Sequence, residues 1–176
     1  VIDLQKCAAC GACHIACKNE NNVQTGFRWA NWISETGGKF PNITYDFIPT
    51  LCNQCEEASC IKICPTQALY KGEGNITMLD TDKCIGTKLC VVACQYGVIS
   101  FNKGETYSFW RDNKPLIEGG TSSPEEITRK VKGKEIPYYN PEREGSSTQP
   151  AVRKKGVAEK CTLCDHRVKK GELPYC

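Results

Sequence analysis

Four cysteines near the N-terminus are spaced closely enough for several of them to ligate one compact inorganic group. Cys7, Cys10, Cys13 and Cys17 form a C-x2-C-x2-C-x3-C run, with alanines and Gly11 between the first three. These small residues allow the backbone to curl around an inorganic core that takes several thiolates from one loop, as an iron–sulfur cluster does. The i to i+4 spacing from Cys13 to Cys17 predicts a short helix that turns both thiols to one side. The run therefore predicts iron–sulfur chemistry.

The chain contains three further versions of this motif. The second ends on a Cys-Pro pair, the third has Thr87 where its second cysteine should stand, and the fourth has a long last spacer. Their cysteines are Cys52, Cys55, Cys60 and Cys64; Cys84, Cys90 and Cys94; and Cys161, Cys164 and Cys176. The residues in front of the motifs recur as Asp3-x2-Lys6-Cys7, as Asp80-x2-Lys83-Cys84, and as Lys160 before Cys161. This repetition predicts one unit of strand, cysteine loop and short helix per motif.

Composition narrows the kinds of site that these cysteines could form. Fourteen cysteines in 176 residues indicate metal or disulfides, because ordinary core packing does not need so many. Disulfide frameworks rarely place cysteines at such short successive spacings, and zinc sites favour two separated C-x2-C pairs. Iron–sulfur clusters are therefore favoured over both. A net charge of +3 is too small to indicate nucleic acid binding, and no apolar run approaches the length of a membrane span.

The segments around the motifs give local predictions. Strands are expected at 1–6 and 98–101, and a hairpin with a glycine-rich turn at 68–79. Within the insertion 18–51, we expect a set of aromatic residues to pack around the clusters, with a docking face for a larger subunit as the alternative: Trp29, Trp32, Phe40, Tyr45 and Phe47. The insertion 102–157 is expected to be an ordered loop that wraps a partner or the domain surface.

The charged residues and histidines are expected to have modest roles. Two basic groups are expected to be solvated rather than to bind an anion: Lys130, Lys132 and Lys134, and Arg153, Lys154 and Lys155. Lys169-Lys170-Gly171 predicts a turn that faces solvent. His14 and His166 are expected to pack against or hydrogen-bond to sulfur, with an iron or proton-relay role as the alternative.

The cysteines can be divided among four clusters by one rule: in proteins with paired clusters, the last cysteine of a run ligates the partner cluster. Pairing the first motif with the fourth, and the second with the third, uses every cysteine. Cluster A then has Cys7, Cys10 and Cys13; cluster B has Cys161, Cys164, Cys176 and Cys17; cluster C has Cys52, Cys55, Cys60 and Cys94; and cluster D has Cys84, Cys90 and Cys64.

Clusters A and D each lack a fourth thiolate in this assignment. For cluster A, we expect the native chain to continue past Cys176 and to supply the missing cysteine. For cluster D, Thr87 stands at the open corner, and a neutral hydroxyl is a poor iron ligand beside thiolate. A [3Fe–4S] cluster is the favoured prediction there. The alternative is a [4Fe–4S] cluster whose fourth iron takes the Thr87 oxygen or water.

The order and spacing of the motifs resemble those of the iron–sulfur subunits of the DMSO-reductase family of molybdenum or tungsten enzymes. Within that family, residues 1–7, 17–22, 48–55 and 160–167 look most like the small subunit of respiratory arsenate reductase, with polysulfide, thiosulfate and DMSO reductase subunits close behind. Thr87 departs from the all-cysteine pattern, and Gln95 from the proline that usually follows the third motif. In the related nitrate reductases a tryptophan at the Thr87 position accompanies a [3Fe–4S] cluster.

The resemblance implies an α+β fold of two pseudo-symmetric bacterial-ferredoxin-like halves, each with two clusters, and long loop insertions. One half would be 1–17 plus 158–176 and the other 52–101, with 18–51 and 102–157 as partner-facing insertions. It further implies four clusters in a line and a large catalytic subunit with a bis-pterin (bis-MGD) molybdenum or tungsten cofactor. A quinol-oxidising membrane-anchor subunit is left open as a further partner.

The function expected from this resemblance is electron transfer, with no catalysis by this chain alone. One alternative function is that of a free multi-cluster ferredoxin, which binds successive enzymes and shuttles electrons between them. A structural zinc module is the third hypothesis. The family implies export from the cytoplasm together with the catalytic partner, and a cytoplasmic location is the alternative.

Overall fold

The computed structural model describes residues 2–24, 26–104, 146, 148–174 and 176. Its elements, in chain order, are α1 (Ala12–Asn21), β1 (Asn31–Lys39), β2 (Asn42–Thr50), α2 (Ser59–Lys62), β3 (Leu69–Lys71), the 3-10 turn η1 (Glu73–Asn75), β4 (Thr77–Leu79), α3 (Leu89–Ala93), β5 (Ser100–Phe101), β6 (Ala158–Glu159) and α5 (Asp165–Val168). Within the described residues, the strands form three antiparallel pairs: β1–β2, β3–β4 and β5–β6. Among these same residues, no helix combines the length and the apolar character that a membrane crossing needs.

Helix α1 carries the last two cysteines of the first motif. Gly11 precedes it in the left-handed region at φ 73°, and Asn22 follows it there at φ 48°, conformations that glycine and asparagine adopt at low cost. The C-terminal part of the helix buries Cys17, Glu20 and Asn21. The helix predicted from the Cys13–Cys17 spacing is confirmed.

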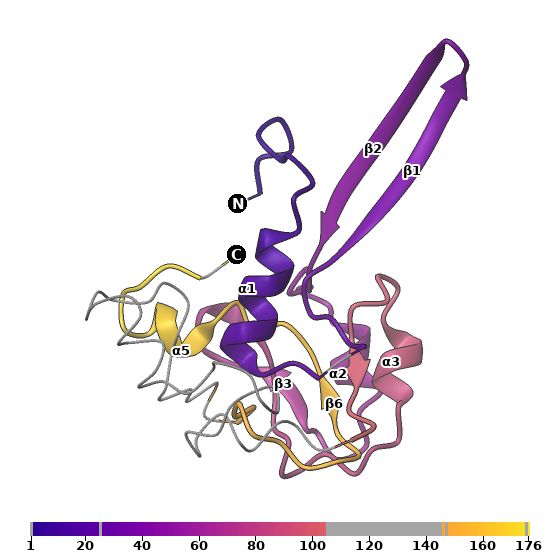
Figure 1. Cartoon of the computed structure of the whole chain (residues 1–176). Coiled ribbons are helices and arrows are strands. Elements are labelled where there is room, and N and C mark those ends of the chain that lie inside the picture. The colour runs from indigo at the N-terminus through magenta and orange to yellow at the C-terminus, as the bar shows by residue number, and fades with distance from the viewer. Residues whose placement is uncertain (1, 25, 105–145, 147, 175) are drawn as a thin grey trace, which may run out of the picture.

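Strands β1 and β2 form a hairpin of nine paired positions that projects from the rest of the molecule (Figure 1). Its turn requires glycine at position 38, because a Cβ there would lie 2.1 Å from the Asn42 carbonyl oxygen. Phe40 and Tyr45 are 87% and 63% exposed, whereas Trp29, just before the hairpin, is 2% exposed. The expected packing of aromatics in this insertion therefore holds for Trp29 and is wrong for Phe40 and Tyr45.

A first core lies around the second and third cysteine motifs. The β3–β4 hairpin turns through η1, which confirms the hairpin predicted at 68–79, and β5 confirms a short strand at the end of 98–101. The buried residues that pack together here are Ala68, Leu69, Leu79, Cys90, Ile99 and Ala158. Because Ala158 belongs to β6, which pairs with β5, the segment that leads into the fourth motif is anchored on this core.

A second core joins the first motif to the fourth. Its buried members are Cys17, Val23, Trp29, Ala30 and Cys161. Residues from the two ends of the chain thus share one interior. The wider division into two pseudo-symmetric halves stays a prediction.

Two local predictions need comment. The strand predicted at 1–6 is wrong for its described residues, because Lys6 N–H bonds to the Asp3 carbonyl and Gln5 N–H bonds to the Asp3 carboxylate, which closes a turn. Most of the 102–157 insertion, with Lys130, Lys132 and Lys134, lies outside the described residues.

Candidate metal centres

All fourteen cysteines belong to the described residues, and all are free thiols. Their burial varies with their place in the motifs. Cys17, Cys90, Cys161 and Cys164 are buried, Cys10 and Cys176 are exposed, and the other eight are partly buried. The chain therefore presents sulfur donors both in its two cores and at its surface.

Cys17 at the end of α1 lies among the cysteines of the fourth motif. Burial raises its pKa well above the usual value, and the negative charges of Cys161, Cys164 and Cys176 raise it further. Burial also raises the pKa of Cys161 to about 11, although the Leu163 N–H donates to its sulfur at 3.3 Å. Thiols from opposite ends of the sequence are thus close enough to repel one another when ionised.

A second group forms around Cys60. Burial raises its pKa, and the thiolates of Cys52, Cys94 and Cys55 add to that increase. Cys94 comes from the third motif, at the C-cap of α3, and the other three come from the second motif. The charge of Lys160 acts on Cys60 in the opposite direction.

A third group contains Cys90, Cys84 and Cys64. Burial, followed by the charges of Cys84 and Cys64, raises the pKa of Cys90 to about 11. These three cysteines line one small cavity together with Thr87. The Ala158 N–H donates to the Cys84 sulfur at 3.5 Å.

Cys64 differs from the other members of this group. Burial is the largest single influence and raises its pKa, but together the N–H groups of Leu69, Ala68 and Thr66 and the Thr66 hydroxyl outweigh burial and lower it. Backbone donors directed at sulfur stabilise a thiolate in the same way that they stabilise other anions.

The remaining three cysteines belong to the first motif: Cys7 and Cys13 are partly buried, and Cys10 is exposed. Cys7 and its neighbours Ala8 and Ala9 line a groove against the base of the β1–β2 hairpin. The Cys13 charge acts on Cys176 of the fourth motif. Burial raises the Cys176 pKa, and the Cys13 charge adds to that increase.

Three electrostatic influences connect thiols of different groups. The Cys60 charge raises the pKa of Cys90, which links the second and third groups. The Cys52 charge raises the pKa of Cys161, which links the second group to the one around Cys17. Cys176 senses Cys13 in the first motif. Each group therefore has a thiol within electrostatic range of a neighbouring group.

This donor set fits iron–sulfur clusters. Several buried thiols beside one another favour their protonated forms, and a cationic metal core reverses that preference by binding thiolates. Within the described residues, no three His, Cys, Asp or Glu side chains converge on a point suited to one ion. The thiolates of a cluster bind different iron atoms, so they need not converge in that way.

Both histidines hydrogen-bond to oxygen. The His14 Nδ1 lies 2.9 Å from the Ala30 carbonyl oxygen, and the His14 ring contacts Trp32 edge-on. The His166 Nε2 lies 2.6 Å from Glu20 Oε1. Packing and hydrogen bonding were expected, but the expected partner, sulfur, is replaced by a carbonyl and a carboxylate.

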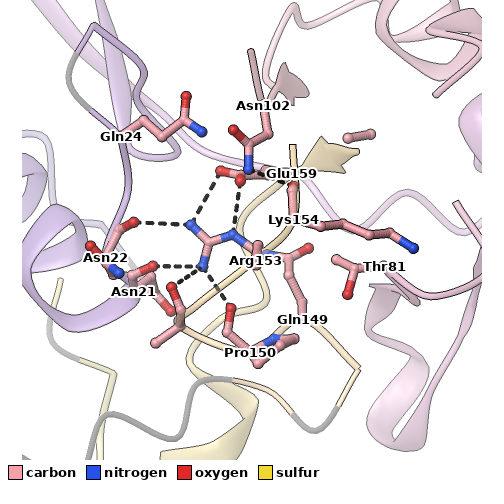
Figure 2. A network of polar contacts seen from close by, with 12 residues as sticks. Asn21, Asn22, Gln24, Thr81, Asn102, Gln149, Pro150, Arg153, Lys154 and Glu159 are labelled. Carbon is pink, nitrogen blue, oxygen red and sulfur yellow. Dashed lines mark hydrogen bonds and ion pairs between the residues drawn. The ribbon is translucent and has the colours of Figure 1, made fainter. Parts of the chain in front are cut away.

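Arg153 corrects a sequence prediction. The sequence predicts that Arg153, Lys154 and Lys155 are all solvated. The two lysines are exposed, but the Arg153 side chain is 0% exposed. Figure 2 shows its guanidinium bonded to both oxygens of Glu159, at 2.8 and 3.3 Å, and to backbone carbonyls that include those of Asn21 and Asn22. Composition could not distinguish Arg153 within an Arg-Lys-Lys run, because only tertiary contacts bury it.

Lys160 is the second charged residue whose position the sequence analysis missed. It is 0% exposed and lies directly before Cys161. The sequence does show that Lys recurs before the first cysteine of a motif. That recurrence does not predict burial, because the other two lysines of the repeat, Lys6 and Lys83, are exposed.

Comparison with known proteins agrees with this donor set. A family described as "4Fe-4S dicluster domain" matches residues 43–109, and one described as "4Fe-4S binding domain" matches residues 4–25. Ferredoxin-like 4Fe–4S domains are therefore present, in a chain that mixes helices and strands.

Relatives that match the whole of this chain are named as components of reductases. The chain is 47% identical over its whole length to the arsenate respiratory reductase iron-sulfur subunit ArrB of Shewanella sp. (strain ANA-3), and it covers 74% of that protein. It is 38% identical to a selenate reductase subunit of Mesobacillus selenatarsenatis and 32% identical to a putative dimethyl sulfoxide reductase iron-sulfur subunit of Halobacterium salinarum. The whole chain matches in both cases, and it covers 54% and 60% of those two proteins.

Proposed function

This chain belongs to the family of iron–sulfur subunits of DMSO-reductase-type oxidoreductases, and on that premise we propose that it relays electrons to or from a molybdenum or tungsten bis-pterin catalytic subunit. Its relatives are named as iron–sulfur subunits, so it is the electron-transfer component and not an enzyme by itself. The observation that carries the proposal is the grouping of buried thiols from motifs far apart in sequence.

The ligand sets of the proposal are those of clusters A to D. The thiolates whose charges raise the pKa of Cys17 support cluster B. Those that act on Cys60 support cluster C, and Cys84 and Cys64, which act on Cys90, support cluster D. Cluster A has three candidate ligands in the first motif: Cys7, Cys10 and Cys13. When bound, such clusters supply reversible one-electron transfer at potentials set by charge, hydrogen bonds and exposure.

The chain's own residues would order and insulate this relay. The influence of the Cys60 charge on Cys90, of the Cys52 charge on Cys161 and of the Cys13 charge on Cys176 supports the order D, C, B, A. Three ligands of cluster B, Cys17, Cys161 and Cys164, are buried and would shield that side of the cluster from water, whereas its fourth ligand, Cys176, and Cys10 of cluster A are exposed. The exposed ligands at the A and B end of the relay would give electrons access to a partner there.

The type of cluster D is the finer part of the proposal. Thr87 lines the same cavity as Cys64, Cys84 and Cys90, which supports its place at the open corner. We propose a [3Fe–4S] cluster there beside three [4Fe–4S] clusters. Mössbauer and EPR spectra of the anaerobically purified complex, with an iron count, test this, and Thr87→Cys should convert cluster D to [4Fe–4S]. Four [4Fe–4S] signals in the unaltered protein would mean that Thr87 or water completes the site.

The proposed catalytic partner is of the arsenate reductase type, on the strength of 47% identity over the whole chain. A partner of the polysulfide, thiosulfate or DMSO reductase type is the alternative. The projecting β1–β2 hairpin, with Phe40 at 87% exposure, supports the partner-facing role of the 18–51 insertion. Size exclusion of native extract tests the partnership: co-elution with a large pterin-containing subunit is expected, and elution alone would favour a free ferredoxin.

Two further elements of the proposal rest on the family. They are a location outside the cytoplasm, reached together with the catalytic subunit, and a membrane-anchor subunit that oxidises quinol. Fractionation of cells under anaerobic growth, with antibodies against this chain, tests both. Recovery in the cytoplasmic fraction would refute the location, and a soluble two-subunit complex would refute the anchor.

A further inference from the structure

Three lysines precede the first cysteine of a motif, but they occupy two different environments. Lys6 and Lys83 have side chains that are 86% and 64% exposed, and each pairs with the aspartate three residues earlier, at 3.7 and 3.5 Å. In the third copy Val157 replaces that aspartate, and Lys160 is 0% exposed. The repeat has therefore lost its carboxylate at the one copy where the lysine is buried.

The ammonium group of Lys160 connects two cysteine motifs through backbone. Its Nζ donates to the Cys161 carbonyl oxygen at 2.6 Å and to the carbonyl oxygen of Thr77 in β4. Within the described residues, no carboxylate lies within ion-pair distance of this Nζ. Two carbonyl dipoles do not neutralise a buried unit charge, and such a charge is costly unless an anion faces it.

The nearest candidate anions are thiolates on either side of Lys160. On one side, Lys160 directly precedes Cys161, a ligand of proposed cluster B. On the other side, the Gln54 side chain donates to the same Cys161 carbonyl at 3.2 Å and accepts from the Thr77 N–H at 2.8 Å. Gln54 directly precedes Cys55, a ligand of proposed cluster C. Cys52 of cluster C packs against the core that contains Cys161, so the two ligand groups are neighbours. A thiolate-ligated cluster carries net negative charge that increases on reduction, so a nearby fixed cation stabilises the reduced form.

We propose that Lys160 is a shared internal counter-ion of clusters B and C, and that its positive charge raises the reduction potentials of both. The inference rests on the proposed function and on the ligand sets of these two clusters. A cation that acts on both clusters shifts both potentials in the same direction and so changes the driving force between them little. Lys160 would thus act through its charge on the clusters. It contacts neither the substrate nor the catalytic cofactor.

The test is EPR-monitored redox titration of the intact complex, with four variants. Lys160→Met and Lys160→Gln remove the charge, Lys160→Arg keeps it, and Lys83→Met removes the charge of the exposed lysine in the same motif position. At a fixed ambient potential, the neutral variants should lower the reduced-to-oxidised ratio of clusters B and C at least tenfold, which for a one-electron couple is about 59 mV. Lys160→Arg should retain most of the potential, and Lys83→Met should leave clusters B and C unchanged.

Several results would overturn the proposal. Unchanged potentials in both neutral variants with full iron content would do so, as would a shift confined to one cluster or an equal shift in Lys83→Met. If the neutral variants lose clusters B and C, the iron count decides: retention by Lys160→Arg supports a counter-ion, and loss from Lys160→Arg as well indicates a purely steric role. A low iron count in the unaltered complex would instead refute the four-cluster function itself.

Discussion

Replacing Arg153 with methionine should destabilise the protein far more than any other change in the basic segment 153–155. The guanidinium is fully buried against Glu159, lies 4.9 Å from the centre of the Trp29 ring, and bonds to the carbonyls of Asn21 and Asn22. It therefore fastens the end of α1 to the strand that leads into the fourth motif. Methionine fills similar space but leaves the Glu159 carboxylate, with a side chain 1% exposed, without its cation.

The magnitude follows from that unpaired charge. Removing one partner of a buried ion pair costs about 3–5 kcal/mol, because the remaining charge stays desolvated. In a protein of this size each kcal/mol lowers the midpoint of thermal unfolding by about 2–4 °C. We therefore expect the midpoint of Arg153→Met to fall by about 6–20 °C. The double variant Arg153→Met/Glu159→Met should recover at least half of the loss, since no buried charge remains.

The assay is thermal unfolding of the cluster-loaded protein, followed by circular dichroism and by release of iron. All variants are compared at one heating rate, because cluster loss makes unfolding irreversible. Lys154→Met is the matched control, since its side chain is exposed and its Nζ reaches only the Asp82 carbonyl at 3.5 Å. The reasoning is refuted if Arg153→Met falls no further than Lys154→Met, or if the double variant is less stable than Arg153→Met alone.

Three further predictions concern the motifs. Gly86→Ala should lower the unfolding midpoint and the iron content of cluster D, because φ is +75° and the new Cβ would lie 2.4 Å from the Gly156 carbonyl oxygen; an unchanged midpoint would contradict that close approach. Cys94→Ser should abolish the EPR signal of cluster C and spare cluster D, although its neighbour in α3, Cys90, is a proposed ligand of D; the reverse pattern would overturn the cross-ligation. Burial raises the pKa of both Cys90 and Cys161 from 9.0 to about 11, so these thiols hold their protons at neutral pH and release them when iron binds. Reconstitution titrated by absorbance should therefore show iron affinity that rises from pH 7 towards pH 9, and a flat profile would contradict protonated thiols in the iron-free protein.

Short-range features were predictable from the sequence. The spacing Cys13–Cys17 predicts α1, and the apolar pairs around Lys71–Asn75 predict the β3–β4 hairpin, because local hydrogen bonds and turn residues decide both. The cysteine spacings predict iron–sulfur chemistry for a similar reason, since three thiolates from one loop need close spacing in the chain itself.

Burial of charge was decided by tertiary structure. Arg153 and Lys154 are neighbours in one basic run, yet one is buried on Glu159 and the other is in solvent. Lys83 and Lys160 occupy the same place in the repeat, and the packing of β6 against β5, followed by the bond to Thr77, buries only the second. A sequence pattern specifies which residues alternate or recur, whereas the desolvation of a charge depends on the segments that fold over it from elsewhere in the chain.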